Sequence, residues 1–205
     1  MRVYPCGTQL FAQGESATDV YLIHQGVLKL VWCDSDGRET IVGLRWPGAF
    51  AGAAALLSTM PHPAGAVTLV DCNIEHIPGA RFVQMLKGDA TLAARTHREQ
   101  SREIVELMHD LGQLGCVSAI TRLGNFIQKS ANAVGDQGCF SDGRLRLPLK
   151  RKDLAALLAI SPEHLSRLLR EMVLEGSIVV NDQWTVIPQT TTPRFAHSSS
   201  RGGDY

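Results

Sequence analysis

The sequence predicts an α+β protein: a β-rich N-terminal half, one long helix, and a second domain of shorter helices ending in a hairpin. Three observations support this prediction. Short apolar runs separated by turn residues fill residues 3–78. Residues 90–114 then contain no proline and only one glycine. The last third has two helical patterns separated by a short turn, followed by two short strand-like runs. Each change of period marks a change of secondary structure.

The N-terminal strands come first in this order. Apolar runs at residues 21–23, 27–32 and 39–44 are separated by His24-Gln25-Gly26 and by the turn signal Asp34-Ser35-Asp36-Gly37. Two more runs, 67–70 and 73–77, meet at Asp71-Cys72. Regularly spaced short strands of this kind are typical of a β-sandwich or jelly roll. We therefore expect a β-sandwich or jelly-roll domain over residues 1–88.

A long helix is expected over residues 89–115. Apolar residues recur at intervals of three, four and three, the a/d spacing of a helix that packs on another helix: Ile104, Leu107, Leu111 and Leu114. Traced backwards, the same seam passes through small or polar residues that include His97 and Gln100. The spacing alone leaves two interpretations open, a helix packed on its own domain and the seam of a parallel dimer.

The C-terminal domain is expected over residues 116–188. It comprises a helix at 118–133, a short strand at 144–147, two helices separated near residues 159–161, and a hairpin at 179–187 with its turn at 181–182. Residues 117–188 carry nine basic and seven acidic side chains, a modest excess that suits binding to specific nucleic-acid sites. The tail 189–205 is rich in Ser, Thr and Gly and is predicted to be disordered.

The two helices near residue 160 have the pattern of a helix-turn-helix. The first should bury Leu154, Leu157 and Leu158. Before the second, Ser161 is a good N-cap, Pro162 suits the first helical position, and Gly176 ends the helix. The apolar residues of the second helix, all expected to be buried, are Leu165, Leu168, Leu169, Met172 and Val173.

The opposite face of this second helix carries Glu163, Ser166, Arg167 and Arg170, spaced so that they share one side. Arg can bind guanine O6 and N7 as a bidentate pair, Glu can accept from cytosine N4, and Ser can contact either kind of base edge. A solvated face with an ordinary Glu–Arg pair is the alternative interpretation. The predicted hairpin favours the DNA-reading interpretation, because a helix-turn-helix followed by a hairpin is a winged arrangement.

The chain resembles the Crp/Fnr family of transcription regulators over about residues 4–188. Four segments of the N-terminal half resemble its cyclic-nucleotide-binding-type jelly roll, and the second helix resembles its recognition helix. These segments are Pro5-x-Gly7-x-x-Leu10-Phe11-x-x-Gly14-Glu15, Val20-Tyr21-Leu22-Ile23-x-x-Gly26-x-Leu28-Lys29-Leu30, Asp36-Gly37-Arg38-Glu39, Pro47-Gly48-x-Phe50-x-Gly52 and Ser161-Pro162-Glu163-x-x-Ser166-Arg167-Leu168-Leu169-Arg170-Glu171-Met172.

The resemblance implies a homodimer joined through helix 89–115, bound to double-stranded DNA at an inverted repeat, with RNA polymerase as a partner. The pattern Glu163-x-x-Ser166-Arg167 is more similar to the Fnr branch, which implies half-sites near TTGAT with Arg167 on the guanine. Glu163, Ser166 and Arg167 would then read bases. The implied phosphate contacts are Lys150, Arg151, Lys152 and Arg170. The family usually places a Ser or Thr helix cap where Lys150 stands.

The sensor region departs from the cyclic-nucleotide branch, which binds its ligand with a Gly-Glu pair and a later Arg-Ser pair. Here Gly52 is followed by Ala53, and no arginine occurs from residue 47 to residue 80. Burying a phosphate without a cation is costly, so we expect cyclic AMP not to be the effector. The Fnr-type cluster of cysteine ligands is also absent, because Cys6 stands alone near the N-terminus.

The effector is left open as haem, another small molecule or none. The candidate effector region comprises Gly52, Ala53, His62, His97 and Gln100, with His76 as a further histidine near the family's pocket. An effector would act by resetting the seam helix around residues 93–100, and with it the spacing of the two recognition helices.

Other classes are disfavoured by what the sequence lacks. The five cysteines are scattered without a C-x-x-C pair, which argues against a disulfide framework or metal site. No catalytic residues are expected, because G-x-S-x-G, H-E-x-x-H and G-x-x-x-x-G-K are missing. A cupin-like metalloenzyme is the nearest enzyme alternative, and a signalling module whose helical half binds protein is the runner-up. Without a long apolar run or signal segment, the expected location is the cytoplasm, with no membrane partner.

Overall fold

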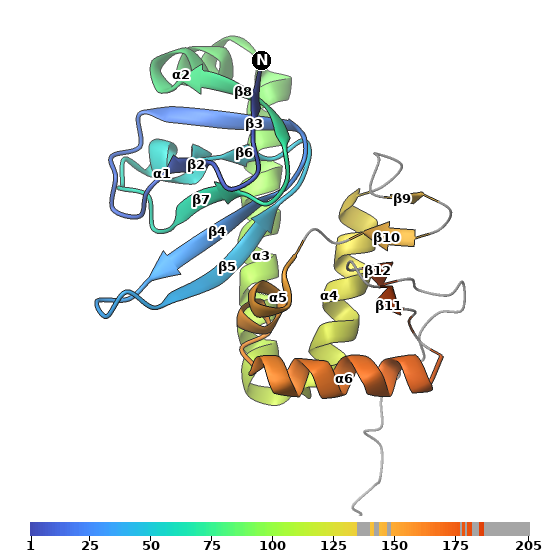
Figure 1. Ribbon diagram of the computed structural model, residues 1–205. Coiled ribbons are helices and arrows are strands. Elements are labelled where there is room, and N and C mark those ends of the chain that lie inside the picture. The colour runs from blue at the N-terminus through green and yellow to red at the C-terminus, as the bar shows by residue number, and fades with distance from the viewer. Residues whose placement is uncertain are drawn as a thin grey trace, which may run out of the picture.

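The computed structural model describes residues 1–134, 140–141, 144–146, 149–176, 178, 180–181 and 185–186. Within them the N-terminal region forms two four-stranded antiparallel sheets (Figure 1). One sheet has the order β1 (Arg2–Tyr4), β8 (Cys72–Pro78), β3 (Asp19–Gln25), β6 (Phe50–Ala51), and the other has the order β2 (Gln9–Phe11), β7 (Gly65–Thr68), β4 (Leu28–Cys33), β5 (Glu39–Arg45). This arrangement confirms the predicted jelly roll.

The core of the jelly roll lies between the two sheets, since its buried side chains come from strands of both. They are Phe11, Ile23, Leu28, Ala51, Ala66, Cys72 and Ile74. Alternate residues along β3 and β8 reach this core, as the two-residue period of a strand requires. The strands predicted at 67–70 and 73–77 correspond to β7 and β8, which lie in different sheets.

Two short helices of the jelly roll were not predicted. Helix α1 (Ala53–Ser58) has six residues, too few for an apolar period to show. Helix α2 (Gly79–Gly88) buries Phe82, whose ring lies 5.2 Å from that of Phe50 between centroids. Both helices contact β3, and together with β3, β6 and β8 they form a second apolar cluster of Val20, Phe50, Ala53, Ile77 and Phe82.

Helix α3 (Ala90–Cys116) follows and runs the length of the molecule behind the jelly roll (Figure 1). It begins at Asp89, whose carboxylate accepts hydrogen bonds from the backbone N–H groups of Thr91 and Leu92 at 2.9 and 3.0 Å. Its N-terminal half is tied to the sandwich, because Arg45 of β5 pairs with Glu103 and the Arg95 guanidinium donates to the Gly48 carbonyl at 3.1 Å. The predicted long helix is confirmed.

The C-terminal domain packs three helices, α4 (Ala119–Val134), α5 (Arg151–Leu157) and α6 (Pro162–Leu174), around one apolar core. Its strands pair in the order β11 (Val180–Asn181), β12 (Thr185–Val186), β10 (Arg144–Arg146), β9 (Phe140–Ser141). The hairpin predicted at 179–187 thus forms between β11 and β12. Its turn at residue 182 and the predicted tail 189–205 lie outside the described residues.

This domain contacts the jelly roll directly. Helix α5 lies against β5, and the half-buried Leu44 and Leu69 of the jelly roll pack on the core of the C-terminal domain. The three buried leucines Leu123, Leu154 and Leu165 come from α4, α5 and α6 respectively, so that core holds all three helices together. In the part of the chain described, no helix has the length and apolar character that crossing a lipid bilayer requires.

Candidate nucleic-acid interface

The start of α6 is stabilised as its sequence requires. The Ser161 hydroxyl oxygen accepts a hydrogen bond from the backbone N–H of His164 at 3.2 Å, and Pro162 occupies the first turn. Glu163 is fully exposed in that turn, near the positive end of the helix dipole. The pKa of its carboxyl lies below the ordinary value because its own backbone N–H and the Ser161 hydroxyl hydrogen-bond to the ionised form. The carboxylate is therefore a charged acceptor.

The two faces of α6 divide by polarity. Leu165, Leu168, Leu169 and Met172 are buried in the domain core. The prediction was wrong for Val173, which is 42% exposed: it lies one residue after the buried Met172, so its side chain points about 100° away from that of Met172 around the helix.

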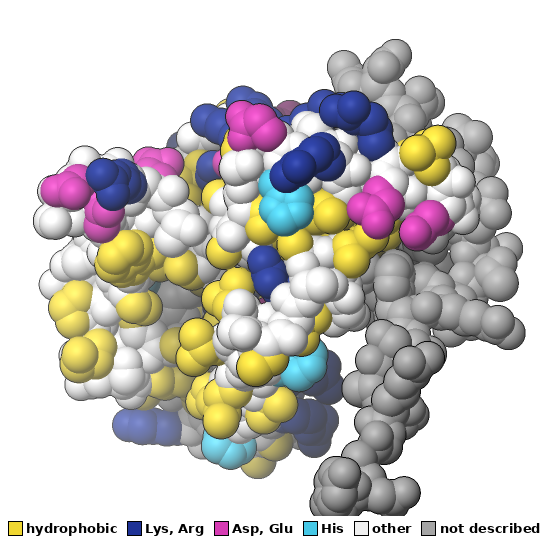
Figure 2. Space-filling model, turned by 90° about the horizontal axis from the view of Figure 1, so that it is seen from below, with side chains coloured by type: hydrophobic (Ala, Val, Ile, Leu, Met, Phe, Trp, Pro, Cys, Tyr) yellow, Lys and Arg dark blue, Asp and Glu magenta, His cyan; other side chains and the backbone are white. Residues whose placement is uncertain are grey.

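The opposite face presents the predicted reading residues to solvent. Glu163, Arg167 and Arg170 are exposed, and Ser166 is half-buried. The Ser166 hydroxyl donates to the Pro162 carbonyl at 2.9 Å, which leaves its oxygen free to accept from a base amino group. In the described residues neither Arg167 nor Arg170 forms an ion pair, so the Glu–Arg pair of the alternative interpretation is not made here. Figure 2 shows the molecule from below, where several Lys and Arg side chains lie along the upper edge of the view and others lie at the left and at the bottom.

The predicted phosphate contacts lie at the start of α5. Lys150 is the N-cap residue, in extended conformation and without a side-chain capping bond, and Lys150, Arg151 and Lys152 are all exposed. The structure thus brings three basic residues to one helix end, the position at which anions are favoured by the helix dipole. Lys152 also lines a cleft against the jelly roll.

Arg122 was missed by sequence reasoning, although it is a charged residue among the apolar positions of α4. Its guanidinium donates to the Val117 carbonyl at 2.7 Å and to the Leu158 carbonyl at 3.0 Å. Val117 lies between α3 and α4, and Leu158 lies in the turn between α5 and α6. One side chain therefore ties the end of the long helix to the helix-turn-helix.

The C-terminal half of α3 exposes an apolar stripe. The predicted seam residues Ile104, Leu107, Leu111 and Leu114 are 59%, 48%, 72% and 48% exposed, and the unpredicted Met108 is 70% exposed. Of the two interpretations left open, packing on the chain's own domain does not account for these positions. Burial of such a stripe is favourable by roughly 25 cal/mol per Å² of apolar surface. It has the character of a contact between two chains.

Polar contacts anchor the other side of the same half of α3 to α4. Lys129 pairs with Glu106 at 2.9 Å and with Asp110 at 3.2 Å. Partial burial lowers the pKa of Lys129, but these two carboxylates outweigh it and the pKa lies above its ordinary value. The Asn125 amide donates to Gln113 at 2.9 Å. The position of α4 is thereby coupled to that of α3.

The candidate effector region is only partly assembled. Gly52 has a φ of +86° and precedes α1, Ala53 is buried, and His62 is 4% exposed with its ring stacked on Phe11 at 3.8 Å. A Cβ on Gly52 would lie 3.2 Å from Cε1 of His62, so these residues are in contact. Burial lowers the pKa of His62, which favours the neutral ring.

The remaining effector candidates lie elsewhere. His97 and Gln100 are on α3, exposed and half-buried respectively. His76 pairs with Asp19 at 3.1 Å on the sheet surface. Among the described residues no group of three His, Cys, Asp or Glu side chains could hold a metal ion.

Comparison with known proteins agrees with this geometry. The model of the cyclic nucleotide-binding domain matches residues 1–89, and that of the Crp-like helix-turn-helix domain matches residues 121–190. An anaerobic regulatory protein of Haemophilus influenzae is 28% identical over 178 residues, which cover 87% of this chain and 68% of that protein. The nitrogen fixation regulation protein FixK of Bradyrhizobium diazoefficiens is 26% identical over 86% of this chain and 73% of its own length.

Solved structures share the fold. FixK2 from Bradyrhizobium japonicum superposes with a TM-score of 0.81 at 20% identity, over 92% of this chain and 91% of that one. The regulator CLP of Xanthomonas campestris superposes with a TM-score of 0.73 at 20% identity, over 92% of this chain and 93% of its own. The two domain models stand in the family's order, one on each side of α3.

The chain belongs to the Crp/Fnr family. It is a transcription regulator of the Crp/Fnr type, as the resemblance implied. The matched model of the cyclic nucleotide-binding domain implies a cyclic nucleotide as ligand, yet the residues present do not fit one. The space beside Gly52 is filled by the buried, uncharged His62 stacked on Phe11. Residues 47–80 supply neither Lys nor Arg to neutralise a phosphate.

Proposed function

We propose that this Crp/Fnr regulator reads an inverted repeat with half-sites near TTGAT. The observation that carries the proposal is the exposed face of α6, where Glu163, Ser166 and Arg167 stand on a capped helix whose other side is buried. The first turns of the second helix are the part of a helix-turn-helix that enters the major groove. Arg167 would bind the guanine of the half-site and Glu163 the cytosine opposite. Lys150, Arg151, Lys152 and Arg170 would contact phosphates.

The regulator would act as a homodimer through the apolar stripe of α3. A two-fold dimer presents two recognition helices to two half-sites, which accounts for an inverted repeat. The named relatives are regulatory proteins. We place this chain in the cytoplasm, where it would act with RNA polymerase on DNA.

The effector, if the chain uses one, would differ from cyclic AMP. It would bind between the jelly roll and the N-terminal half of α3, where His97 and Gln100 lie, and reset the spacing between the two recognition helices. Haem stays among the candidates by ligand chemistry, since histidine is a usual haem ligand.

Fluorescence anisotropy tests the site. Purified protein at a fixed, near-physiological salt concentration is titrated onto a TTGAT–ATCAA palindrome, a duplex with one half-site, and a scrambled duplex. We expect binding to the palindrome to be tightest, because both recognition helices are engaged. Equal weak binding to all three duplexes, with and without cell extract as a source of effector, would contradict the proposed site.

A further inference from the structure

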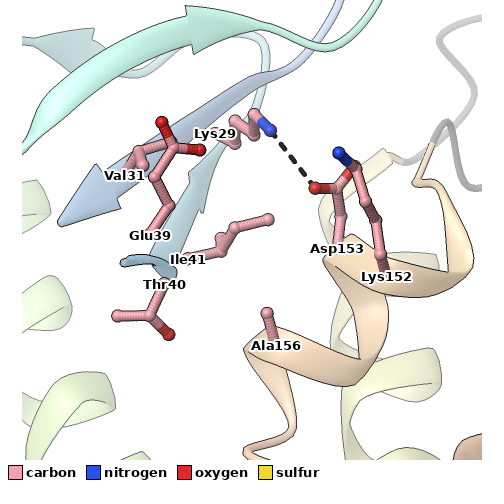
Figure 3. A pocket seen from close by; sticks show the side chains of 8 residues that line it. All are labelled: Lys29, Val31, Glu39, Thr40, Ile41, Lys152, Asp153 and Ala156. Carbon is pink, nitrogen blue, oxygen red and sulfur yellow. Dashed lines mark hydrogen bonds and ion pairs between the residues drawn. The ribbon is translucent and has the colours of Figure 1, made fainter. Parts of the chain in front are cut away.

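A charged contact joins the jelly roll to the DNA-binding domain. Lys29 of β4 and Asp153 of α5 lie 124 positions apart in sequence, and Nζ of Lys29 lies 3.2 Å from Oδ1 of Asp153 (Figure 3). Their side chains are 18% and 10% exposed. A contact so well shielded from water is strong only while both partners are present, because removing one leaves the other charge buried and uncompensated.

The pair lies beside a cleft and beside apolar contacts between the two domains. The pair borders a cleft of about 190 Å³ between the two domains, lined on the jelly-roll side by Val31, Glu39 and Ile41 and on the other by Lys152 and Ala156. Apolar contact is made beside it, where Leu44 and Leu69 pack on the helical core. Apolar packing has no direction, whereas an ion pair has one. The pair therefore adds a directional contact between α5 and β4 to this apolar packing.

Asp153 occupies a sensitive place in the DNA-binding domain. It is the third residue of α5, directly after the basic residues at 150–152 that we propose as phosphate contacts. A free carboxylate there would repel the DNA backbone and weaken the local positive charge. Helix α5 is followed by α6 after only a short turn, so any tilt of α5 moves the reading face as well.

We propose that Lys29, although it belongs to the sensor domain, is a positioning residue for DNA binding. By pairing with Asp153 it cancels the carboxylate charge beside the basic residues and holds α5, and through it α6, in the orientation seen here. The proposal rests on the proposed function, since it concerns the affinity for the TTGAT palindrome. The contact between the jelly roll and α5 would then affect the affinity for DNA without contacting either DNA or an effector.

The experiment is a double-mutant cycle on palindrome affinity with Lys29→Gln, Asp153→Asn and the double variant. Lys29→Gln, which leaves the carboxylate free beside the DNA, should weaken binding by roughly 5- to 150-fold, the usual range for coupling between sites. Asp153→Asn loses the orienting contact but also removes the negative charge, so it should weaken binding by less. The double variant should bind no more weakly than the worse single one, because two neutral side chains leave no buried charge unpaired. Lys29→Arg should retain most of the affinity. Lys87→Gln, an exposed lysine on α2, is the matched control and should match wild type.

A second readout does not depend on DNA. A carbodiimide joins an amine to a carboxylate in direct contact, so wild type should yield a crosslinked peptide containing Lys29 and Asp153, and Lys87→Gln should yield the same product. Thermal melts by circular dichroism ensure that all variants are compared while folded. The positioning role would be overturned if folded Lys29→Gln bound the palindrome as tightly as wild type or more tightly. It would also be overturned if the loss of affinity in the double variant equalled the product of the two single losses. In either case the proposed function would stand. Wild type that ignores the palindrome would overturn both.

Discussion

The reading face of α6 and the effector region beside α1 are built in opposite ways. On α6 the charged and hydroxyl side chains face water, while a leucine-rich side fixes the helix to the core. Beside α1 the candidate effector residues are turned inward, with His62 stacked on Phe11 against Gly52. One region retains open polar groups for a partner, and the other has filled its space with its own side chains.

This difference indicates what can diverge within the family's architecture. A reading face can be altered only residue by residue, because each side chain meets a base edge. A ligand space, by contrast, is closed once a few buried side chains fill it. In this chain the face of α6 is open to solvent, and the space beside Gly52 is occupied by His62 and Phe11.

The largest effect is expected at the exposed apolar stripe of α3, through which two chains would pair and so present two recognition helices to the DNA. Leu111→Glu places a charge on a residue that is 72% exposed in the single chain. If a partner chain covers it, the dimer is lost, and affinity for the palindrome should fall by about a hundredfold or more, as when two linked sites become independent. Analytical ultracentrifugation and anisotropy measure both changes.

Leu57→Glu is the matched control, since Leu57 is also an exposed leucine, on α1. It should leave both the sedimentation coefficient and the affinity unchanged. A Leu111→Glu protein that still sediments and binds as wild type does would remove α3 as the dimer contact.

The closed effector region is tested next. Gly52→Ala and Gly7→Ala each force alanine into the left-handed region, at φ values of +86° and +83°, at a cost of about 1–2 kcal/mol. Only at Gly52 does the new methyl group also meet neighbours, 3.0 Å from the Asp19 carbonyl and 3.2 Å from His62. Urea unfolding should therefore show a larger loss of stability for Gly52→Ala. Equal losses would mean that the space beside Gly52 is open.

A smaller effect is expected from pH. Because burial lowers the pKa of His62, the unfolded chain binds a proton more readily than the folded one. The stability contributed by the neutral ring is complete above its ordinary pKa of about 6.5 and is lost as the pH falls below that value. His62→Gln should lose less stability than wild type between pH 7.5 and pH 5.5, measured by urea unfolding. His97→Gln, at an exposed position, should behave as wild type does.

The smallest effect concerns the turn before the reading helix. Ala159 has a φ of +53°, a conformation that costs a non-glycine residue about 1–2 kcal/mol. Ala159→Gly should raise the free energy of unfolding by about 0.5–1 kcal/mol, after the larger backbone entropy of glycine is subtracted. Ala156→Gly, inside α5, should instead lower it by about 1 kcal/mol. Thermal melts of the two variants distinguish these outcomes.

Features that depend on residues close together in the sequence could be predicted. The cap at Ser161, the apolar period of α6 and the heptad spacing of α3 all lie within a few turns, so their patterns could be read directly. Contacts between distant segments could not be predicted. Nothing in the residues around Lys29 indicates Asp153, and nothing around Arg122 indicates that its guanidinium meets two carbonyls in different turns. Val173 was wrongly predicted to be buried, because the apolar period shows which side of a helix is apolar but not how much of that side a neighbouring element covers.

The proposed contact between Arg167 and the guanine of the half-site can be tested by a double-mutant cycle that changes the side chain and the base. Wild type and Arg167→Ala are titrated onto the TTGAT palindrome and onto the same duplex with each guanine–cytosine pair changed to adenine–thymine. A bidentate Arg–guanine contact contributes about 1–3 kcal/mol of discrimination. We predict that wild type prefers the guanine duplex clearly, whereas Arg167→Ala binds both duplexes equally and weakly. An Arg167→Ala protein that retains the wild-type preference for guanine would contradict the proposed contact between Arg167 and guanine.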